Sequence, residues 1–297
     1  MTIYTIIVTY NGHRWMDFCL GSLRKSSIKT IPLIIDNGST DDTIPYIRIQ
    51  YPEVILFPQG RNLGFGQANN IGLRYALAHN ADYVLLLNQD AAIASNAIEL
   101  MLAQSDEKSL LSPIHMNGDG TKVDFSFREN TLYHCPNLIN DAFANNIKPY
   151  YFSSEICAAC WLLPISIVKQ IGGFNPIFFH YCEDNNYYHR LVYHNISCRL
   201  VPAARMYHDR KEFGNEQVYR KQWLWGCMLL NATNINFTQR ERFLEQLGLL
   251  WKCYRYRLGE GHYHIGSFLW HLCKLSVHLS TIRHSRKIEK QKKATWL

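Results

Sequence analysis

Short apolar runs separated by amphipathic segments constrain the fold of this chain more than any other feature. Residues 12–25 and 66–79 carry apolar side chains at helical spacing. Four strand-length runs rich in apolar residues flank these segments, at residues 3–9, 31–35, 53–57 and 83–87. Strands that are apolar on both faces and alternate with helices form a parallel sheet covered by helices on both sides. The predicted fold class is therefore α/β, with ligands bound beyond the carboxyl ends of the strands.

The second half of the chain is less regular. Residues 112–152 are rich in Asn, Gly, Tyr and His, which predicts loops and a small hairpin. We expect a helix-like segment from residue 157 to Gly172-Gly173, and a second helix from Glu183 to about His194. A strand at residues 196–201 and mostly helical structure over residues 216–282 complete the prediction.

Charge is concentrated at the end of the chain. The net charge is +7, and residues 240–297 hold 12 Lys and Arg against 4 Asp and Glu. This asymmetry favours contact with an anionic surface, either a membrane or a nucleic acid.

Nine cysteines without regular spacing indicate a reducing, cytoplasmic compartment. The first residues are typical of a first strand and not of a signal peptide, and no run of apolar residues predicts a spanning helix.

Two glycine-containing motifs follow strands. Asp36 opens the motif DNGSTD, where an acid at a strand end can accept hydrogen bonds from a base or ribose. The alternative is an Asx turn that caps the next helix through Thr40 or Asp41. Residues 61–72 (RNLGFGQANNIG) lead into a helix whose backbone N–H groups could bind phosphate, and a plain turn explains them equally well.

Two acidic motifs suggest chemistry. Asp90 ends the motif NQD after the strand at residues 83–87, where one carboxylate could hold Mg²⁺ or Mn²⁺ together with phosphates. Asp90 could instead cap the following helix. Glu183 and Asp184 follow an aromatic, uncharged run that could raise a carboxyl pKa toward the range of a general base. Acids at a helix N-terminus are also favoured by the helix dipole, and the two explanations are compatible.

In their order, these motifs resemble glycosyltransferase family 2, which has the GT-A fold, and within it the rhamnosyltransferase-like branch. The resemblance covers about residues 3–210 and rests on TYN, DNGSTD, N-x-GFG-x-ANN-x-G, LLNQDA, CAACWLLP, GGF…FF…Y-x-ED and a later His. It implies a GT-A catalytic domain over residues 1–212, with a mostly parallel central sheet, and a mostly helical region with a basic tail over residues 213–297.

The resemblance also implies roles for individual residues. Thr9 and Asn11 would line the nucleotide pocket, and Asp36 would meet the base. The cofactor-binding set is completed by Asn62 and Gly64 near the diphosphate and by Asn88 in the D-x-D-like motif. Asp90 and His208 would bind the divalent cation, Mg²⁺ or Mn²⁺. Asp184 would be the catalytic base, with Glu183 beside it.

Three departures from the family pattern stand out. Asn88 replaces the first acid of D-x-D, so one carboxylate that would bind the metal is missing. Asn175-Pro176 replaces the acidic end of GGFDE, and Asn186 replaces the second acid of ED-x-D.

Cys157 and Cys160 form C-x-x-C, a pattern of redox pairs and half zinc sites. Without a second such pair, we interpret them as small buried residues near the donor sugar.

The implied activity is inverting transfer of a sugar from a nucleoside diphosphate to an acceptor hydroxyl. The first donor expected is dTDP-rhamnose, with UDP-hexose or UDP-galactofuranose as alternatives. The acceptor expected is a growing lipid-linked glycan of a bacterial surface polysaccharide. A sugar nucleotidyltransferase would need a basic glycine-rich N-terminal signature, whereas residues 8–14 read VTYNGHR. A non-catalytic module would not need Asp90 and Asp184, and a nucleic-acid binder would not need the acidic motifs.

The C-terminal region predicts a membrane contact. Apolar residues at spacings of three and four would form one face of a helix, made of Ile265, Phe268, Leu269, Leu272, Leu275, Leu279 and Ile282. Basic residues from Arg283 to Lys293 follow this face and suit an anionic leaflet. The enzyme would then be cytoplasmic and peripheral on the inner face of the membrane. The alternative is a helix packed on the catalytic domain or on a second subunit of a homo-oligomer.

Overall fold

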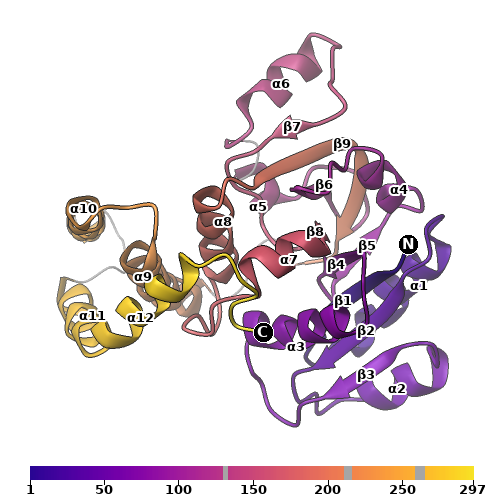
Figure 1. Cartoon of the computed structure of the whole chain (residues 1–297), viewed down its shortest axis with the longest axis horizontal. Coiled ribbons are helices and arrows are strands. Elements are labelled where there is room, and N and C mark those ends of the chain that lie inside the picture. Colours follow the sequence, from indigo (N-terminus) through magenta and orange to yellow (C-terminus); the bar gives the residue numbers. More distant parts are fainter. Residues whose placement is uncertain (130–132, 211–215, 258–264) are drawn as a thin grey trace.

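The computed structural model describes residues 1–129, 133–210, 216–257 and 265–297. One sheet contains nine strands of these residues (Figure 1). The strands are β1 (Ile3–Thr9), β2 (Ile31–Asp36), β3 (Ile55–Pro58), β4 (Tyr83–Leu87), β5 (Ala91–Ile93), β6 (Ser109–Asn117), β7 (Tyr151–Phe152), β8 (Cys160–Pro164) and β9 (Ser197–His208).

The helices cover both faces of this sheet and form a separate group at the end of the chain. The sheet is flanked by η1 (His13–Trp15), α1 (Met16–Lys25), α2 (Thr43–Gln50), α3 (Phe65–Ala78), α4 (Ala97–Leu102), α5 (Phe125–Phe127), α7 (Ile165–Ile171) and α8 (Glu183–Tyr193), whereas α6 (Pro136–Phe143) projects beyond β7 (Figure 1). The terminal group is α9 (Glu216–Thr233), α10 (Gln239–Arg257), α11 (Ile265–Val277) and α12 (Leu279–Glu289).

The strand order is β3-β2-β1-β4-β8-β6-β9-β5, with β7 paired to β9. The first four strands in this order are parallel, as the sequence predicts. Beyond β4 the sheet becomes mixed, because β8 runs antiparallel to β4 and β5 runs antiparallel to β9. The α/β class and the GT-A type of sheet are confirmed, and a further parallel pair, β6 with β9, lies beyond β8.

Alternate side chains of the central strands enter two separate cores, one on each face of the sheet. Ile6 and Leu33 pack with α3, α7 and α8, whereas Ile7 and Ile34 pack with α1, α2 and α4. Full burial of one aliphatic side chain stabilises the folded state by about 1.5–3 kcal/mol. This two-sided burial explains why the strands read as continuous apolar runs.

Two elements differ from the sequence prediction. Residues 109–117, expected largely as loop, form the long strand β6, and its pairing with β9 shifts register between Pro113 and Ile114. A proline inside a run argues against a strand unless a bulge accommodates it, and a bulge does so here. The helix expected from residue 157 is in part the strand β8, and α7 begins only after Pro164.

The predicted apolar face of the C-terminal region is divided between α11 and α12 and is turned partly inward. Phe268 and Ile282 are each 1% exposed, because they pack against α9 and its neighbours. Leu269, Trp270 and Val277 remain exposed. The side chain of Ile265 lies outside the described residues. Part of this face therefore packs against other helices of the protein, which was the alternative to membrane contact.

The end of the chain returns to the part of the molecule that contains α3 and α7. Gly173 donates its N–H to the Thr295 carbonyl oxygen at 2.9 Å, and the Thr295 hydroxyl donates to the Ile171 carbonyl at 2.8 Å. Leu297 packs against the core that contains α3 and α7, and the C-terminus lies beside α3 in Figure 1. The domain boundary expected between residues 212 and 213 lies outside the described residues. None of the described helices is long and apolar enough to cross a membrane.

Two glycines with positive φ test the contribution of this returning tail to stability. Gly60 has φ +65° and open space where a Cβ would be, whereas a Cβ on Gly172 (φ +78°) would lie 1.9 Å from the Thr295 carbonyl oxygen. Gly60→Ala should lower the free energy of unfolding by about 1–2 kcal/mol through backbone strain alone. Gly172→Ala should cost about 1–3 kcal/mol more, because the tail must move. Urea denaturation measures both values, and equal losses would contradict the packing of the tail.

Candidate active site

The predicted site residues gather at the carboxyl edge of the parallel strands. β1 ends at Thr9 and β2 at Asp36, and these two residues are paired in register. β4 lies on the other side of β1, so the segment Asn88-Gln89-Asp90 leaves the sheet at the same edge. The carboxyl ends of neighbouring parallel strands form a crevice there, as the sequence predicts.

Gln89, the middle residue of the NQD motif, ties two strands together. Its side-chain oxygen accepts a hydrogen bond from the Thr9 hydroxyl at 2.7 Å and another from the Tyr10 N–H at 3.0 Å. A Cβ at Gly12 would lie 2.3 Å from the same oxygen, so only glycine fits beside this contact. Sequence reasoning gave Gln89 no role. The structure shows that it holds the end of β1 against the Asp90 loop.

The Asp36 carboxylate is occupied by its own turn. It accepts hydrogen bonds from the N–H groups of Gly38 and Ser39, both at 3.0 Å, and from the Ser39 hydroxyl, and it is fully buried. Asn11 (φ +48°) reaches across this turn and accepts a hydrogen bond from the Thr40 N–H at 2.8 Å. Asp36 therefore forms the local turn considered above, whereas the predicted cap is not formed, since α2 has Asp42 as its N-cap without a side-chain cap hydrogen bond.

The glycine-rich loop is held in place by two asparagines. The Asn62 side chain accepts from the Gly64 N–H at 2.8 Å, and the Asn37 side chain donates to the Gly64 carbonyl at 3.2 Å. Gly64 has φ +79°, and a Cβ there would lie 2.0 Å from the Phe179 carbonyl oxygen. The loop before α3 thus lies directly against the aromatic segment that precedes Asp184.

Asp90 and His208, which the resemblance names as ligands of one cation, lie in contact although they are 118 positions apart in the sequence. His208 Nε2 lies 3.1 Å from Asp90 Oδ1, and His208 is 3% exposed. The contact follows from strand pairing, because β5 runs antiparallel to β9 with Ala91 opposite His208. His208 Nδ1 is buried without a hydrogen-bond partner among the described residues.

The pair fits two ligands of a divalent cation. His208 Nε2 and Asp90 Oδ1, which lie 3.1 Å apart, would be the atoms that hold such a cation. No group of three or more His, Cys, Asp or Glu able to hold a metal occurs among the described residues. Diphosphate oxygens and water would therefore have to complete the coordination shell, as is common for Mg²⁺.

Asp184 stands at the first turn of α8 with both carboxylate oxygens engaged. The Asn185 N–H donates to Oδ1 at 2.9 Å, and the Ala158 N–H donates to Oδ2 at 3.4 Å. The residue is partly exposed, whereas its neighbour Glu183 is 7% exposed and its Oε2 has no hydrogen-bond partner among the described residues. Asp184 is thus the member of the pair that an acceptor hydroxyl can reach.

Burial raises the pKa of both acids. Removal of the Asp184 carboxylate from water raises its pKa, and the hydrogen bonds from backbone N–H groups oppose this rise. Burial also raises the pKa of Glu183, and the adjacent Asp184 charge raises it further. A carboxylate with a raised pKa accepts a proton more readily than an exposed one, which suits a general base.

One short segment before β8 connects the Asp90 loop to Asp184. The Ala158 N–H donates to Asp184, and the carbonyl of the next residue, Ala159, accepts from the Asn88 N–H at 3.0 Å. Cys157 and Cys160 flank these alanines as free thiols, and Cys160 is fully buried. The segment brings the predicted cation ligands and the predicted base to one site, and small residues leave it room to pass.

Sequence reasoning missed a positively charged side chain at this site, that of Arg210. Arg210 forms an ion pair with the buried Asp124, with Nε at 2.9 Å from Oδ2. Burial lowers the pKa of Arg210, but the hydrogen bond and charge of Asp124 raise it, and Cys157 and Asp90 lie close enough to add smaller increases. The signal in the sequence was its position two residues after His208. Burial lowers the pKa of the nearby His115 to about 3, so this imidazole is neutral.

The comparisons with known sequences agree on one family. Residues 4–172 match the sequence profile described as Glycosyl transferase family 2. The chain is 29% identical over 180 residues to the low-salt glycan biosynthesis hexosyltransferase Agl10 of Haloferax volcanii, covering 58% of this chain and 57% of that protein. It is 27% identical over 237 residues to the N-acetylglucosaminyl-diphospho-decaprenol L-rhamnosyltransferase of Mycobacterium tuberculosis, covering 69% and 75%. It is 22% identical to the dTDP-rhamnosyl transferase RfbF of Shigella flexneri, covering 69% and 68%.

Solved structures share the fold. The mannosyltransferase PcManGT of Pyrobaculum calidifontis, in complex with GDP-Man and Mn²⁺, superposes with a TM-score of 0.62 at 12% identity, over 97% of this chain and 83% of that one. S. aureus TarS residues 1–349, in complex with UDP-GlcNAc, also give 0.62, at 15% identity, over 98% and 91%. At these identities the likeness is one of fold alone.

Proposed function

Because the chain belongs to glycosyl transferase family 2, we propose that it transfers a sugar from a nucleoside diphosphate to an acceptor hydroxyl with inversion at the anomeric carbon. One observation carries the proposal. The segment Ala158-Ala159 holds Asp184 with one residue and the Asp90 loop with the next, so a base and a pair of cation ligands face one crevice. We assign the catalytic unit to residues 1–212 and the helical region to residues 213–297.

The residues of the crevice divide between the two substrates. We assign the nucleotide to the carboxyl edge of β1 and β2, lined by Thr9, Asn11 and the turn that Asp36 holds. The diphosphate would meet the N-terminus of α3, where Asn62 and Gly64 set the backbone, and Asn88 directly follows β4. Backbone N–H groups at a helix N-terminus favour an anion.

Charge on the leaving diphosphate needs compensation. A divalent cation, Mg²⁺ or Mn²⁺, bound by Asp90 and His208 would supply a Lewis acid for the leaving phosphate. Arg210 lies beside Asp90 and adds a fixed positive charge to this side of the crevice. The complex of PcManGT with GDP-Man and Mn²⁺ supports this assignment by its similarity in fold.

Asp184 takes the proton of the acceptor hydroxyl as that oxygen attacks the anomeric carbon. The attack displaces the nucleoside diphosphate from the opposite face, so one step inverts the configuration. Glu183 is buried at the same helix end, where burial and the charge of Asp184 raise its pKa to about 8. No second nucleophilic carboxylate is required in such a displacement.

The donor and acceptor proposed follow from the relatives. Two of them are named as rhamnosyltransferases, which favours dTDP-rhamnose as donor. The name of the mycobacterial relative describes a diphospho-decaprenol acceptor, which favours a lipid-linked glycan. The UDP-GlcNAc complex of TarS keeps UDP-hexoses among the candidates, with UDP-galactofuranose as a further one.

A lipid-linked acceptor places the enzyme at the inner face of the membrane. Lys287, Lys292 and Lys293 are exposed on α12 and the residues after it. Exposed basic side chains near an anionic leaflet contribute about 1 kcal/mol each to membrane binding. We therefore propose cytoplasmic, peripheral attachment through this region, and the exposed apolar residues of α11 are also available for a second subunit.

The stereochemistry of the product tests the proposal. Transfer from the accepted sugar nucleotide to an acceptor should give a glycosidic bond with the anomeric configuration opposite to that of the donor. NMR coupling constants of the product read this configuration directly. A product with retained configuration would refute the single displacement. Formation of a sugar nucleotide from NTP and sugar phosphate would instead identify a nucleotidyltransferase.

A further inference from the structure

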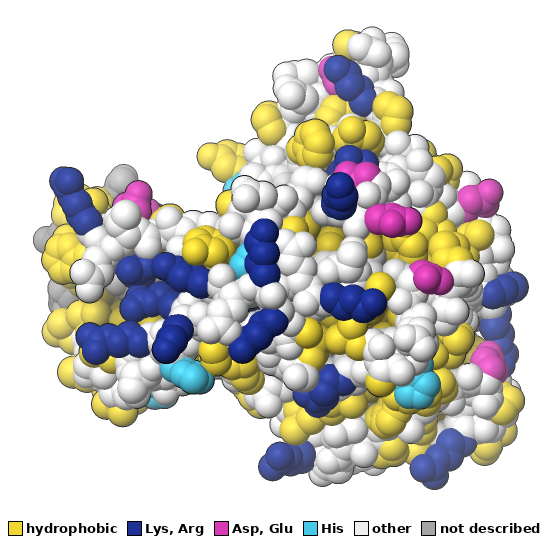
Figure 2. All heavy atoms as spheres, viewed as in Figure 1, with side chains coloured by type: hydrophobic (Ala, Val, Ile, Leu, Met, Phe, Trp, Pro, Cys, Tyr) yellow, Lys and Arg dark blue, Asp and Glu magenta, His cyan; other side chains and the backbone are white. Residues whose placement is uncertain are grey.

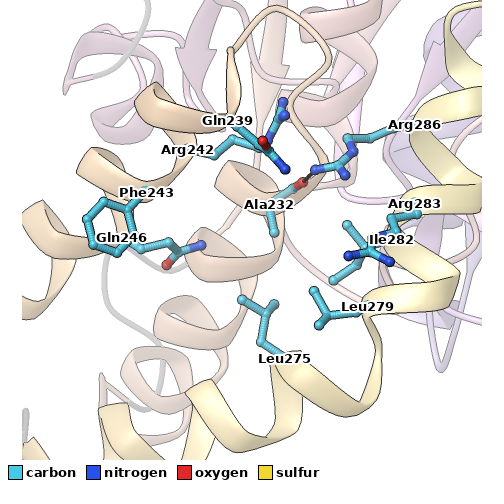
Figure 3. Close-up of a pocket in the computed structure, with 10 residues that line it drawn as sticks. All are labelled: Ala232, Gln239, Arg242, Phe243, Gln246, Leu275, Leu279, Ile282, Arg283 and Arg286. Carbon is cyan, nitrogen blue, oxygen red and sulfur yellow. Dashed lines mark hydrogen bonds between the residues drawn. The ribbon is translucent and has the colours of Figure 1, made fainter.

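A cavity of about 210 Å³ opens between the C-terminal helices, away from the crevice described above (Figure 3). Its lining combines two kinds of side chain. The apolar wall is made of Ala232, Phe243, Leu275, Leu279 and Ile282. The polar part is made of Gln239, Gln246, Arg242, Arg283 and Arg286. No acidic residue is among these ten lining residues.

The three arginines bring positive charge to this cavity, although Arg242 also interacts with the neighbouring Glu241. Arg286 donates to the Ala232 carbonyl oxygen at 3.0 Å, and Arg242 donates to the Asn234 carbonyl at 3.1 Å. These contacts fix two guanidinium groups without neutralising them. Arg283 is exposed and has no hydrogen bond or ion pair within the described part of the chain. Burial lowers the pKa of Arg286, and the charges of Arg242 and Arg283 lower it further.

Positive charge beside an apolar wall is complementary to an anion that carries a hydrocarbon chain. Guanidinium groups bind phosphate oxygens through paired N–H donors. A free phosphate would leave the apolar wall in water, whereas a phosphate ester of a lipid would cover both parts. In Figure 3 the side chains of Leu275 and Leu279 lie below the arginines, and Ile282 lies next to Arg283.

The surface around the cavity suits a bilayer. Phe243, which lines the cavity, is 63% exposed, and Leu244, Leu247 and Trp251 on the same helix are 50%, 43% and 60% exposed. Apolar side chains beside basic ones are typical of surfaces that lie in the membrane interface. Figure 2 shows Lys and Arg side chains gathered over this helical region, with apolar side chains at its outer edge.

The cavity is also connected to the helix that carries the base. Ala232 and Ile282 line the cavity and belong to a small buried cluster with Phe178 and Cys182. Cys182 lies two residues before Asp184 and occupies the position before the first turn of α8. A ligand in the cavity would therefore be one layer of side chains away from the segment that positions Asp184.

We propose that this cavity binds the headgroup phosphate of an anionic membrane phospholipid, with Arg283 and Arg286 on the phosphate and the hydrocarbon chain along Phe243, Leu275 and Leu279. The inference rests on the membrane contact proposed above, and it is independent of the donor sugar and of catalysis. It converts a general attraction of basic residues to a leaflet into a defined lipid site.

Titration of the full chain with dihexanoyl phosphatidic acid, below its micelle concentration, tests this site. Binding should be at least tenfold tighter than that of dihexanoyl phosphatidylcholine or inorganic phosphate. Arg283→Gln should weaken binding of phosphatidic acid about tenfold, because a charged hydrogen bond is lost. Lys287→Gln is the matched control: it removes one exposed charge from the same helix outside the cavity, and it should change binding less than twofold.

Three outcomes would overturn the proposal. Equal losses in the two variants would show a diffuse effect of charge. Equal binding of inorganic phosphate would show that the apolar wall is not used, and stronger binding of farnesyl diphosphate than of phosphatidic acid would assign the cavity to a prenyl diphosphate. Sugar-nucleotide binding is measured on the same samples to keep the two proposals separate. If the protein binds phosphatidic acid but no sugar nucleotide, only the transferase assignment is refuted.

Discussion

Replacement of Asp184 by asparagine is expected to lower turnover by about 10²–10⁴-fold while donor binding survives. Asparagine keeps the size and the hydrogen-bond acceptor toward Ala158, but it cannot take a proton from the acceptor hydroxyl. Steady-state kinetics with calorimetric binding of the donor separate the two effects. Asp119→Asn is the control, because it makes the same change at an exposed turn after β6.

The pH dependence of the wild-type enzyme supplies a second check on this assignment. The base must be ionised, and burial raises the pKa of Asp184 above its ordinary value of 3.8. Activity should therefore be full above the raised pKa and should fall as the pH drops through it. This acidic limb should be absent from the residual activity of Asp184→Asn. Near-normal transfer by that variant would eliminate Asp184 as the base.

Asp90→Ala is expected to lower kcat/KM by about a hundredfold or more, because the cation that it helps to hold contributes several kcal/mol to charge stabilisation. The variant should also bind the donor more weakly in Mn²⁺, and the added effect of Mn²⁺ on binding should shrink. Titration of donor with and without Mn²⁺ measures this difference. After this change, His208 would remain as the protein ligand of the cation.

Treatment of the wild-type enzyme with EDTA separates the metal assignment from a structural role of Asp90. Full activity after EDTA would mean that Asp90 acts without a metal, and Asn88 in place of the first acid would be the reason. In that case Arg210, which lies beside Asp90, would be the cation that faces the leaving diphosphate. Arg210→Gln would then have the larger effect of the two variants.

The sequence predicts much of the catalytic half because its signals are local. The parallel strands are apolar on both faces, and each motif follows a strand end, so Thr9, Asp36 and Asp90 had to share one edge of the sheet. The link between Asp90 and His208 follows from the resemblance and is realised by the pairing of β5 with β9.

Other features depend on contacts that no local pattern encodes. Pro113 argues against a strand, yet the register shift beside it lets β6 join the sheet. The backbone N–H of Ala158 has no side-chain signature, although it holds Asp184. The ion pair of Arg210 with Asp124 joins residues 86 positions apart. The return of Thr295 to Gly173 was equally unpredictable, since small polar residues near a terminus are usually solvated.

The binding of sugar nucleotides tests the central claim most directly. A thermal-shift series with dTDP-rhamnose, UDP-hexoses and UDP-galactofuranose, each with and without Mn²⁺, compares the candidate donors under one condition. A ligand present at about 100 times its Kd stabilises the folded state by about 2.7 kcal/mol, which is readily measured as a rise in Tm. We predict that at least one of these donors raises Tm and raises it further with Mn²⁺. No shift with any sugar nucleotide, with or without Mn²⁺, would contradict the assignment of this crevice as a donor site.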